Sequence, residues 1–547
     1  MTVNHDIFSL QRTLTDAFKS ACVKLGVPQA PILVEAPKDP SHGDYSSPLA
    51  MNLAKELRKS PMAIANELIP LIKTDPSILK SVSAAPPGFI NLTLEPSYFH
   101  RALAEVLEKD KEYGRNEQGL GLKVLLEFVS ANPTGPLNVV NGRAAALGDS
   151  IANLLKASGA MVHKEYYVND AGVQARLFGE SLLAACERVQ GKPTPAPEGG
   201  YQGAYMEDLA REYLLIDIGS RPDPDTWGMA RVLRWHEKSL QDYGVTFDRW
   251  YSEKRELHES KLVDKTVDRL REAGLTFEKD GALWLKVSEY GAPKDEVLVK
   301  GDGLPAYFAA DIAYHLQKFD RGYGRLLDIW GPDHHGHIQR MKSALAAIRY
   351  PAEQFVVLTA QQVNLLEGGE KVKMSKREGK FVTMDELLEK VGRDAARFFF
   401  VMRSSNTHMD FDIEVAKKQT DENPVYYVQY AHARICSLLK KTAEKGLRPE
   451  LDPEKLHYLL EPEAFLLLKE ILEYPQWVAE SGKAYEPHRI VAFLQNLAAD
   501  FHLFYSKHRI LDAPVEVANA RLSLALGVKN VIRNALGLLG VSAPEKM

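Results

Sequence analysis

The feature that most constrains the fold of this chain is an apolar segment, residues 122–129, followed at once by a proline- and glycine-rich turn. Its nearly continuous apolar run is typical of a strand buried on both faces of a parallel sheet. Beyond the turn, apolar residues recur at steps of three and four over residues 137–154, which predicts one face of a helix. Pro136 fits the first turn of that helix, with Thr134 or Gly135 before it. In doubly wound sheets, ligands bind at such a strand-to-helix turn.

The same pattern returns later in the chain. A strand, a turn, a helix and a further strand are predicted over residues 326–330, 331–332, 338–348 and 354–359. We therefore expect an α/β, Rossmann-type catalytic domain with a parallel sheet over residues 120–420. A proline- and glycine-rich stretch at 190–203 indicates an insertion in this domain, at about 180–300.

The remaining parts of the chain read as two further domains, because 547 residues are too many for one hydrophobic core. Residues 1–112 combine a helical pattern at 7–25 with a strand at 88–94, which predicts a small α+β domain. After Pro424 only helical periodicity is found, so residues 421–547 are expected to form an all-α helical bundle.

Composition places the chain among soluble globular proteins, with 45% hydrophobic and 26% charged residues. A net charge of -5 excludes a globally basic nucleic-acid binder, although it leaves room for local basic patches. The three cysteines form no CxxC pair, which argues against a disulfide framework or a zinc ribbon. The N-terminus lacks a secretion signal, and no apolar run approaches the ~20 residues of a membrane span. These features predict a cytoplasmic enzyme that does not enter a membrane.

A short basic segment, Lys373-Met-Ser-Lys376, lies between glycines and just before a capping-box pair, Thr383 and Glu386. The ordinary interpretation of such a lysine run is a solvated loop. A mobile pair of lysines together with a helix N-terminus is also what holds a triphosphate and neutralises the charge that develops on it. This pairing indicates nucleotide chemistry.

The segment from Asp333 to His337 contains three histidines and superficially resembles a metal site. The histidines are too close in sequence for a structural zinc site and no cysteine lies nearby, so substrate contact is favoured over metal binding. Tyr307 and Asp311 lie four residues apart and share a helix face, although either residue alone is ordinary. The tyrosines at 426–430 suit base stacking or plain core packing.

At this point the chain resembles the class I aminoacyl-tRNA synthetases, and among them the arginyl-tRNA synthetases. The resemblance covers essentially the whole chain. It is carried by the segments 42–45, 130–137, 165–170, 302–316, 330–335, 372–377, 422–434 and 538–544.

The family implies a Rossmann-type catalytic domain with an insertion, an N-terminal domain that contacts the corner of the tRNA, and a helical domain for the anticodon stem. The implied reaction converts L-arginine and ATP to arginyl-adenylate and then transfers arginine to the 3′ end of tRNA-Arg. Family members typically need tRNA for the first step. ATP would arrive with Mg²⁺ that the protein does not cage, and a monomer is expected.

The resemblance also implies roles for particular residues. The catalytic residues would be Lys373, Lys376, Asn138 and Asn141. ATP would be bound by Pro136, Asn138, Val140, Asn141, Gly142, Lys373, Met374, Ser375 and Lys376. Arginine would be bound by Ser130, Asn132, Glu253, Tyr307, Asp311, Asp333 and His334. No residue is expected to hold a metal ion.

The chain departs from the family at residues 138–141, where it has Asn-Val-Val-Asn and the family commonly has His-Val-Gly-His. Asparagine keeps hydrogen-bond donors but never carries charge, and Val140 adds a branched side chain where glycine is usual. We interpret this as a working variant, because the lysine segment and the arginine contacts are present. Two alternatives remain: a catalytically silent tRNA-binding paralogue, and an adenylate-forming ligase that works without tRNA.

Overall fold

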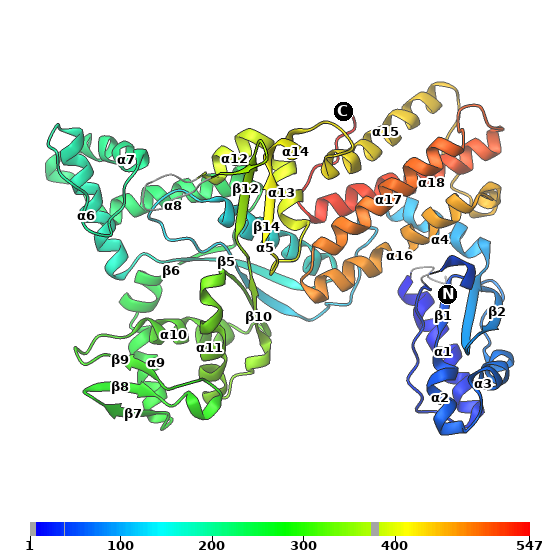
Figure 1. The fold of residues 1–547 in the computed structure, drawn as a ribbon, viewed down its shortest axis with the longest axis horizontal. Helices are drawn as coiled ribbons and strands as arrows, with labels where there is room; N and C mark the ends of the chain where they lie inside the picture. Colours follow the sequence, from blue (N-terminus) through cyan, green and yellow to red (C-terminus); the bar gives the residue numbers. More distant parts are fainter. Residues whose placement is uncertain (1–6, 38, 373–381) are drawn as a thin grey trace.

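The computed structural model describes residues 7–37, 39–372 and 382–547. Figure 1 shows a central sheet with helical and mixed lobes on one side and a long helical region on the other. The N-terminal residues, in blue, form a separate small body beside the C-terminal helices. The predicted lysine segment, 373–376, lies outside the described residues.

The central sheet has five parallel strands in the order β11-β10-β4-β5-β6. These strands are β4 (Lys123–Glu127), β5 (Met161–Val168), β6 (Arg249–Ser252), β10 (Arg325–Trp330) and β11 (Phe355–Thr359). Helix α5 (Val139–Ala157) follows β4, and α11 (His335–Ala347) follows β10. The parallel sheet and the α/β class are as the apolar strand patterns predicted.

The turn between β4 and α5 differs from the prediction at both ends. The strand ends at Glu127, because Val129 and Ser130 take left-handed backbone angles, with φ of 68° and 38°. The helix begins at Val139 with Asn138 as its N-cap, so the placement of Pro136 in the first helical turn was wrong. A reciprocal capping box between Asn138 and Asn141 satisfies backbone N–H groups at this helix start.

Two inserted segments flank β6. Between β5 and β6 lie α6 (Gly172–Val189), α7 (Ala204–Leu214) and α8 (Pro224–Asp242). Between β6 and β10 lie a π-helical turn (Lys254–Glu259), α9 (Leu262–Glu272), β7 (Thr276–Lys279), β8 (Ala282–Leu285), β9 (Glu296–Val299) and α10 (Tyr307–Asp320). Strand β6 therefore interrupts the range 180–300 and returns to the central sheet beside β5.

A smaller sheet, of three strands, follows β11 and leads toward the C-terminal helices. It is built from β12 (Val363–Glu367), β13 (Glu370–Lys371) and β14 (Met409–Asp412), in the order β13-β12-β14. Helices α12 (Met384–Val391), α13 (Arg393–Val401) and α14 (Ile413–Lys417) accompany it. Thr383 and Glu386 form the predicted capping box at the start of α12.

The N-terminal body contains a three-stranded antiparallel sheet in the order β1-β3-β2. Its elements are α1 (Ile7–Leu25), β1 (Tyr45–Ser47), α2 (Leu49–Leu57), α3 (Pro61–Leu68), β2 (Leu79–Ala85), β3 (Phe89–Leu94) and α4 (Pro96–Lys109). Helix α4 leaves this sheet and packs against the C-terminal helices. The Tyr113 hydroxyl, just after it, donates to the Ile471 carbonyl at 2.9 Å.

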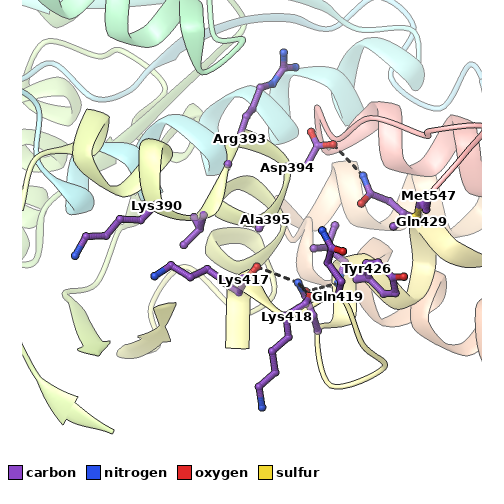
Figure 2. A pocket seen from close by; sticks show the side chains of 15 residues that line it. Lys390, Arg393, Asp394, Ala395, Lys417, Lys418, Gln419, Tyr426, Gln429 and Met547 are labelled. Carbon is purple, nitrogen blue, oxygen red and sulfur yellow. Dashed lines mark hydrogen bonds between the residues drawn. The ribbon is translucent and has the colours of Figure 1, made fainter. Parts of the chain in front are cut away.

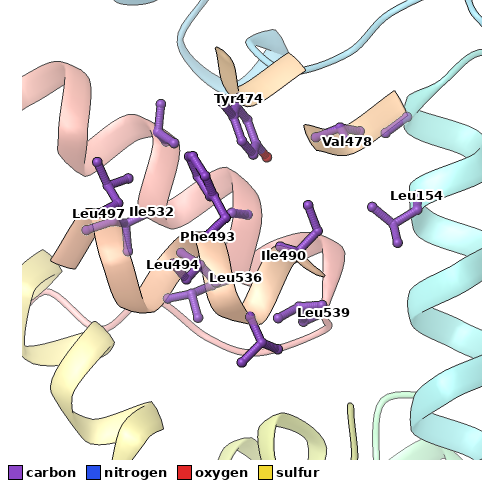
Figure 3. Packing of buried hydrophobic residues seen from close by; sticks show 14 of the residues in the cluster. Leu154, Tyr474, Val478, Ile490, Phe493, Leu494, Leu497, Ile532, Leu536 and Leu539 are labelled. Atoms are coloured by element: carbon purple, nitrogen blue, oxygen red, sulfur yellow. The ribbon is translucent and has the colours of Figure 1, made fainter. Parts of the chain in front are cut away.

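The C-terminal region is helical, as predicted. It contains α15 (Pro424–Glu444), α16 (Pro462–Ala484), α17 (His488–Lys507) and α18 (Val515–Leu538). Figure 3 shows its apolar core, in which Phe493 and Ile490 of α17 lie beside Tyr474 and Leu154. Because Leu154 belongs to α5, the helical domain packs directly on the helix that leaves the predicted ligand turn. Among the described residues, we find no helix that is both long and apolar enough to cross a membrane.

Candidate active site

The N-terminus of α5 is closed by its own two asparagines. Asn138 Oδ1 accepts hydrogen bonds from the backbone N–H groups of Val140 at 2.9 Å and Asn141 at 3.1 Å. Asn141 Oδ1 accepts from the Asn138 N–H at 3.0 Å. Both amide oxygens therefore face the backbone, and both Nδ2 groups are left as donors with no hydrogen bond to another described residue. This arrangement offers the Nδ2 groups of both asparagines as N–H donors to a ligand at the turn.

The segment that follows the lysines returns to the same turn. The Met384 N–H donates to the Leu137 carbonyl at 2.8 Å, and Thr383 forms a β-bridge with Asn138. A Cβ built on Gly142 would lie 3.2 Å from Met384 Cγ, so the helix and the returning segment are in close contact. Only Val382 separates this bridge from residues 373–381. The chain that follows the lysine segment is thus described again from Val382, directly beside the α5 N-terminus.

Ser130 lies at the end of β4, where the backbone is strained. Val129 is β-branched and has φ of 68°, a rare conformation that surrounding contacts must hold in place. The Ser130 hydroxyl donates to Glu127 Oε1 at 3.0 Å and accepts from the Tyr167 N–H at 3.1 Å. These contacts fix Ser130 at the carboxyl edge of the sheet, between β4 and β5.

Glu253 is 7% exposed and is held in place through its chain neighbours. Asp170 accepts from the Ser252 hydroxyl at 2.6 Å and from the Lys254 N–H at 2.8 Å, which fixes the backbone on both sides of Glu253. Burial raises the pKa of Glu253, hydrogen bonds from His258 and Tyr167 oppose this shift, and the charge of Asp311 adds to it. A cation bound between Glu253 and Asp311 would remove that repulsion.

Asp311 and Tyr307 are placed differently, although they share one face of α10. Asp311 Oδ2 lies 2.9 Å from His337 Nε2 and belongs to the group around Tyr167 and Glu253. Tyr307 is 65% exposed, and its hydroxyl lies near Gly172 at the start of α6. It therefore stands at the rim of the site.

The other predicted residues lie at the rim or outside the described side chains. Asn132 is exposed and donates to Gln174 Oε1 of α6 at 2.6 Å. Asp333 is exposed after β10. Pro136 and Val140 are partly buried at the turn. The side chain of His334 and the residues Lys373, Met374, Ser375 and Lys376 lie outside what the structure describes.

Tyr167 is a central site residue that the sequence reasoning missed. Its ring packs against Tyr251 and Tyr314, and its hydroxyl is a hydrogen-bond partner of Glu253. Burial raises its pKa, with further effects from Glu253 and Asp311. The only signal in the sequence was its place in the segment 165–170. Neighbouring β5 side chains alternate between the two faces of the sheet, so this place alone does not show which of them belong to the site.

Helices of the first insertion cover the β4–α5 turn. The Tyr205 hydroxyl of α7 donates to the Thr134 carbonyl at 2.9 Å. His236 of α8 places Nε2 2.7 Å from the Gly135 carbonyl, and its Nδ1 lies 3.0 Å from the Tyr166 hydroxyl. Burial lowers the pKa of His236 to about 4, so it is neutral at neutral pH. The helices of the first insertion therefore hold the backbone of the β4–α5 turn in place through these hydrogen bonds.

A separate cavity of about 640 Å³ lies between α12–α13 and α14–α15, lined in part by Met547 (Figure 2). Its basic side chains are Lys390, Arg393, Lys417 and Lys418, and the lysines pair with Glu367, Glu414 and Glu422. None of the predicted site residues lines this cavity. The candidate active site is therefore the carboxyl edge of the central sheet, next to the α5 N-terminus.

Models of known families match three parts of this chain. Residues 9–94 match the arginyl tRNA synthetase N-terminal domain. Residues 204–432 match the catalytic domain of tRNA synthetases class I (R), and residues 428–547 match the DALR anticodon binding domain.

Relatives and solved structures agree with these matches. An arginine–tRNA ligase of Desulforamulus reducens is 44% identical, with 96% of this chain and 95% of the relative covered. One of Moorella thermoacetica is 44% identical, with 98% of each covered. A putative arginyl-tRNA synthetase structure from Campylobacter jejuni has a TM-score of 0.76 at 33% identity, with 83% of this chain and 100% of that chain covered. The Thermus thermophilus arginyl-tRNA synthetase, with a TM-score of 0.77, is 24% identical over 98% of this chain and 100% of that chain, and supports the fold. With these matches over nearly its full length, the chain belongs to the class I arginyl-tRNA synthetases.

Proposed function

We propose that this chain attaches L-arginine to the 3′ end of tRNA-Arg, with ATP, at the carboxyl edge of its central sheet. The observation that carries the site assignment is the contact of residues 383–384 with Leu137 and Asn138. This contact brings the residues that follow the lysine segment to the α5 N-terminus, and the charge of Asp311 acts on Glu253. A triphosphate and a planar cation then have adjacent places in one site.

In the first step, the arginine carboxylate attacks the α-phosphorus of ATP and pyrophosphate leaves. No protein nucleophile is required, so the residues act by positioning and by stabilising charge on the phosphate oxygens. Lys373 and Lys376 supply positive charge, and the Nδ2 groups of Asn138 and Asn141 donate hydrogen bonds. The ATP contacts that we infer also include Pro136, Val140, Gly142, Met374 and Ser375.

Mg²⁺ is proposed to arrive with ATP. The described residues contain no group of three His, Cys, Asp or Glu side chains placed to hold a metal ion. The donors at the α5 N-terminus are N–H groups, which suit phosphate oxygens and do not bind a cation. Mg²⁺ would neutralise charge on the triphosphate, and the chain would bind the phosphates around it.

Arginine is proposed to place its charged groups between Glu253 and Asp311. A guanidinium presents N–H groups in a planar fork, which carboxylates match with paired hydrogen bonds. Ser130, Asn132 and Tyr307 would orient the rest of the substrate, together with Asp333 and His334. Lysine lacks the fork, so unpaired carboxylate contacts would disfavour it by about 1–3 kcal/mol each.

The domain boundaries that we propose are residues 1–112, 120–420 with inserted segments on either side of β6, and 421–547. The family matches to 9–94 and 428–547 support the outer two domains. We propose that the first domain contacts the corner of tRNA and that the helical domain binds the anticodon stem.

We also propose a cytoplasmic location and a monomeric state. The cysteines Cys22, Cys186 and Cys436 are all free, which suits a reducing compartment. Both parts of the proposed site come from one chain, which supports a monomer. Light scattering of the pure protein tests the second proposal.

The test of the proposed function is arginine-dependent exchange of pyrophosphate into ATP, measured with and without tRNA-Arg. Exchange that requires tRNA supports the proposal. Tight tRNA binding without exchange would indicate a silent tRNA-binding paralogue. Exchange at equal rates with and without tRNA would indicate an adenylate-forming ligase that does not use tRNA, and the proposal would then be wrong.

A further inference from the structure

Three carboxylates lie side by side at the carboxyl edge of the central sheet. The strand register pairs Asp328 of β10 with Glu127 of β4, and Glu127 with Glu165 of β5. Asp328 and Glu165 are fully buried, and Glu127 is nearly so. A row of buried carboxylates is unfavourable in its charged form unless cationic partners offset the burial. Burial raises the pKa of Glu127, and the charge of Lys318 opposes that shift.

Helix α10 supplies a lysine and a histidine to this row. Lys318, which is 0% exposed, places Nζ 2.6 Å from Glu127 Oε2 and 3.0 Å from Asp328 Oδ1. His315 Nε2 lies 3.0 Å from Asp328 Oδ2. Burial acts against ionisation of Asp328, but Lys318 and His315 outweigh it and lower its pKa. The pair Lys318–Asp328 is therefore ionised inside the protein.

Both ends of this network reach residues of the proposed arginine site. At one end, Glu127 Oε1 accepts from the Ser130 hydroxyl at 3.0 Å. At the other, His315 Nδ1 lies 2.8 Å from the backbone carbonyl of Asp311. Asp311, His315 and Lys318 lie on one face of α10, since they are four and three residues apart. We call the series Ser130–Glu127–Lys318–Asp328–His315–Asp311 the buried ion chain.

Stability alone does not account for the buried ion chain. Helix α10 already packs Phe308, Ile312 and Leu316 into an apolar core. Apolar residues of similar volume often replace a buried ion pair without loss of stability. The ion chain adds a fixed geometry. Its hydrogen bonds set the rotation of α10 about its axis and the orientation of the Ser130 hydroxyl.

We propose that the buried ion chain holds Ser130 and Asp311 at the spacing that arginine requires, so that Glu127, Lys318, Asp328 and His315 are positioning residues for arginine binding. This inference rests on the proposed function, in which Ser130 and Asp311 contact the substrate. Neither Glu127 nor Lys318 touches arginine in this arrangement. Their effect passes through the two residues at the ends of the chain, and it is specific to one of the two small substrates.

Glu127→Gln is the sharpest test, because it keeps the size of the side chain and removes one acceptor. In tRNA-dependent pyrophosphate exchange, we expect the KM for arginine to rise at least about tenfold, while the KM for ATP stays within about twofold. Asp328→Asn, which alters the chain from the side of His315, should give the same split. Melting temperatures of both variants show whether they fold.

Asp149→Asn is the matched control. Asp149 is a buried carboxylate that pairs with Lys164 at 3.0 Å and Arg397 at 2.7 Å, outside the ion chain. Its loss should lower the melting temperature without a selective change in the KM for arginine. Glu127→Gln combined with Ser130→Ala should raise that KM by little more than the larger single effect, because both changes act on one contact.

Asp311→Asn separates failure of this inference from failure of the proposed site. If Asp311→Asn raises the KM for arginine while Glu127→Gln and Asp328→Asn leave it within about twofold, the site stands and the positioning role is overturned. If Asp311→Asn also has no effect, the proposed arginine site is wrong and the inference falls with it. Equal rises in both KM values would indicate general loosening of the fold and would overturn the positioning role.

Discussion

At the scale of single residues, the two asparagines at the start of α5 show how a helix cap sets the chemistry of a site. Each Oδ1 is occupied by backbone N–H groups, so the amide orientation is fixed by the capping box. The Nδ2 groups then point their donors away from the backbone. Histidine at these positions would add a titratable group, whereas asparagine donates at every pH.

The substitution Asn138→Asp separates the role of this side chain as a helix cap from its role as a hydrogen-bond donor to ATP. Aspartate keeps the oxygen that accepts from Val140 and Asn141, and it suits the positive end of the helix, so the melting temperature should be unchanged or higher. It loses the N–H donors and adds a negative charge next to the triphosphate, so exchange should slow by at least about tenfold. Equal rates in the variant and the parent would exclude Asn138 from the ATP contacts.

Lys376→Ala tests the proposed lysine segment directly. Loss of a main electrostatic stabiliser of the transition state should lower the exchange rate by at least about 100-fold. Lys390→Ala, in the cavity of Figure 2, is a control lysine from the same part of the chain. It should leave exchange within about twofold, because Lys390 pairs with Glu367 and belongs to another pocket. Near-normal exchange in Lys376→Ala would remove this segment from the mechanism.

At the scale of elements, α16 and α17 meet through a partly buried pair of acids. Glu470 of α16 has its pKa raised to about 9, by burial first and then by Asp500 of α17, with which it shares a hydrogen bond. In the unfolded chain the same group titrates near 4.5. The folded state therefore keeps a proton that the unfolded state releases, and stability falls as pH rises from about 4.5 to about 9.

Glu470→Gln should remove this loss of stability at higher pH. The amide replaces the protonated acid, donates to Asp500 and does not titrate, so the variant should be more stable than the parent at pH 7 by at most roughly 3 kcal/mol. The measurement is the melting temperature of both proteins across pH 5–8, where the parent should decline more steeply. Glu444→Gln, at the exposed end of α15, is the control. Parallel curves for Glu470→Gln and the parent would contradict the shared proton.

At the scale of the whole molecule, Arg397 joins three parts of the chain at one point. It is fully buried and donates to the Leu539 carbonyl at 2.9 Å, the Tyr243 carbonyl at 3.2 Å and Asp149 Oδ2 at 2.7 Å. Those partners belong to the C-terminal region, the first insertion and α5. A Cβ on Gly540 would lie 2.2 Å from Arg397, so the chain end fits closely around the guanidinium. Contacts of this kind connect the helical domain to the site.

Arg397→Met should destabilise the protein by about 3–5 kcal/mol, because carbonyl groups and a carboxylate lose a buried cationic partner. Differential scanning calorimetry measures the change, and the transition of the C-terminal helices should shift with that of the catalytic domain. Arg393→Met is the control, since Arg393 is exposed and, among the described residues, donates a hydrogen bond to the Gly540 carbonyl alone. A shift no larger than that of the control would show that Arg397 does not join these parts.

Local patterns in the sequence were sufficient for much of the fold. The apolar run before Glu127 predicts a buried strand, and the spacing of Thr383 and Glu386 predicts a capping box, since both depend on residues close in the chain. The start of α5 was misplaced because Pro136 was taken as a residue of the first helical turn, whereas Asn138 caps the helix through reciprocal hydrogen bonds with Asn141.

The candidate site shows the limit of local information. The family is readable in the sequence motifs, and the resemblance then assigns roles to Glu253 and Asp311. Tyr167, Glu127 and Lys318 gained their roles only when strand register and the rotation of α10 brought distant residues within 3 Å of one another, as Lys318 and Glu127 show at 2.6 Å. Local periodicity determines which face of an element is buried, but partners across a sheet are set by packing over the whole molecule. The elements and the residue types of the site can therefore be predicted from local sequence, whereas the contacts between those residues follow from packing of the whole chain.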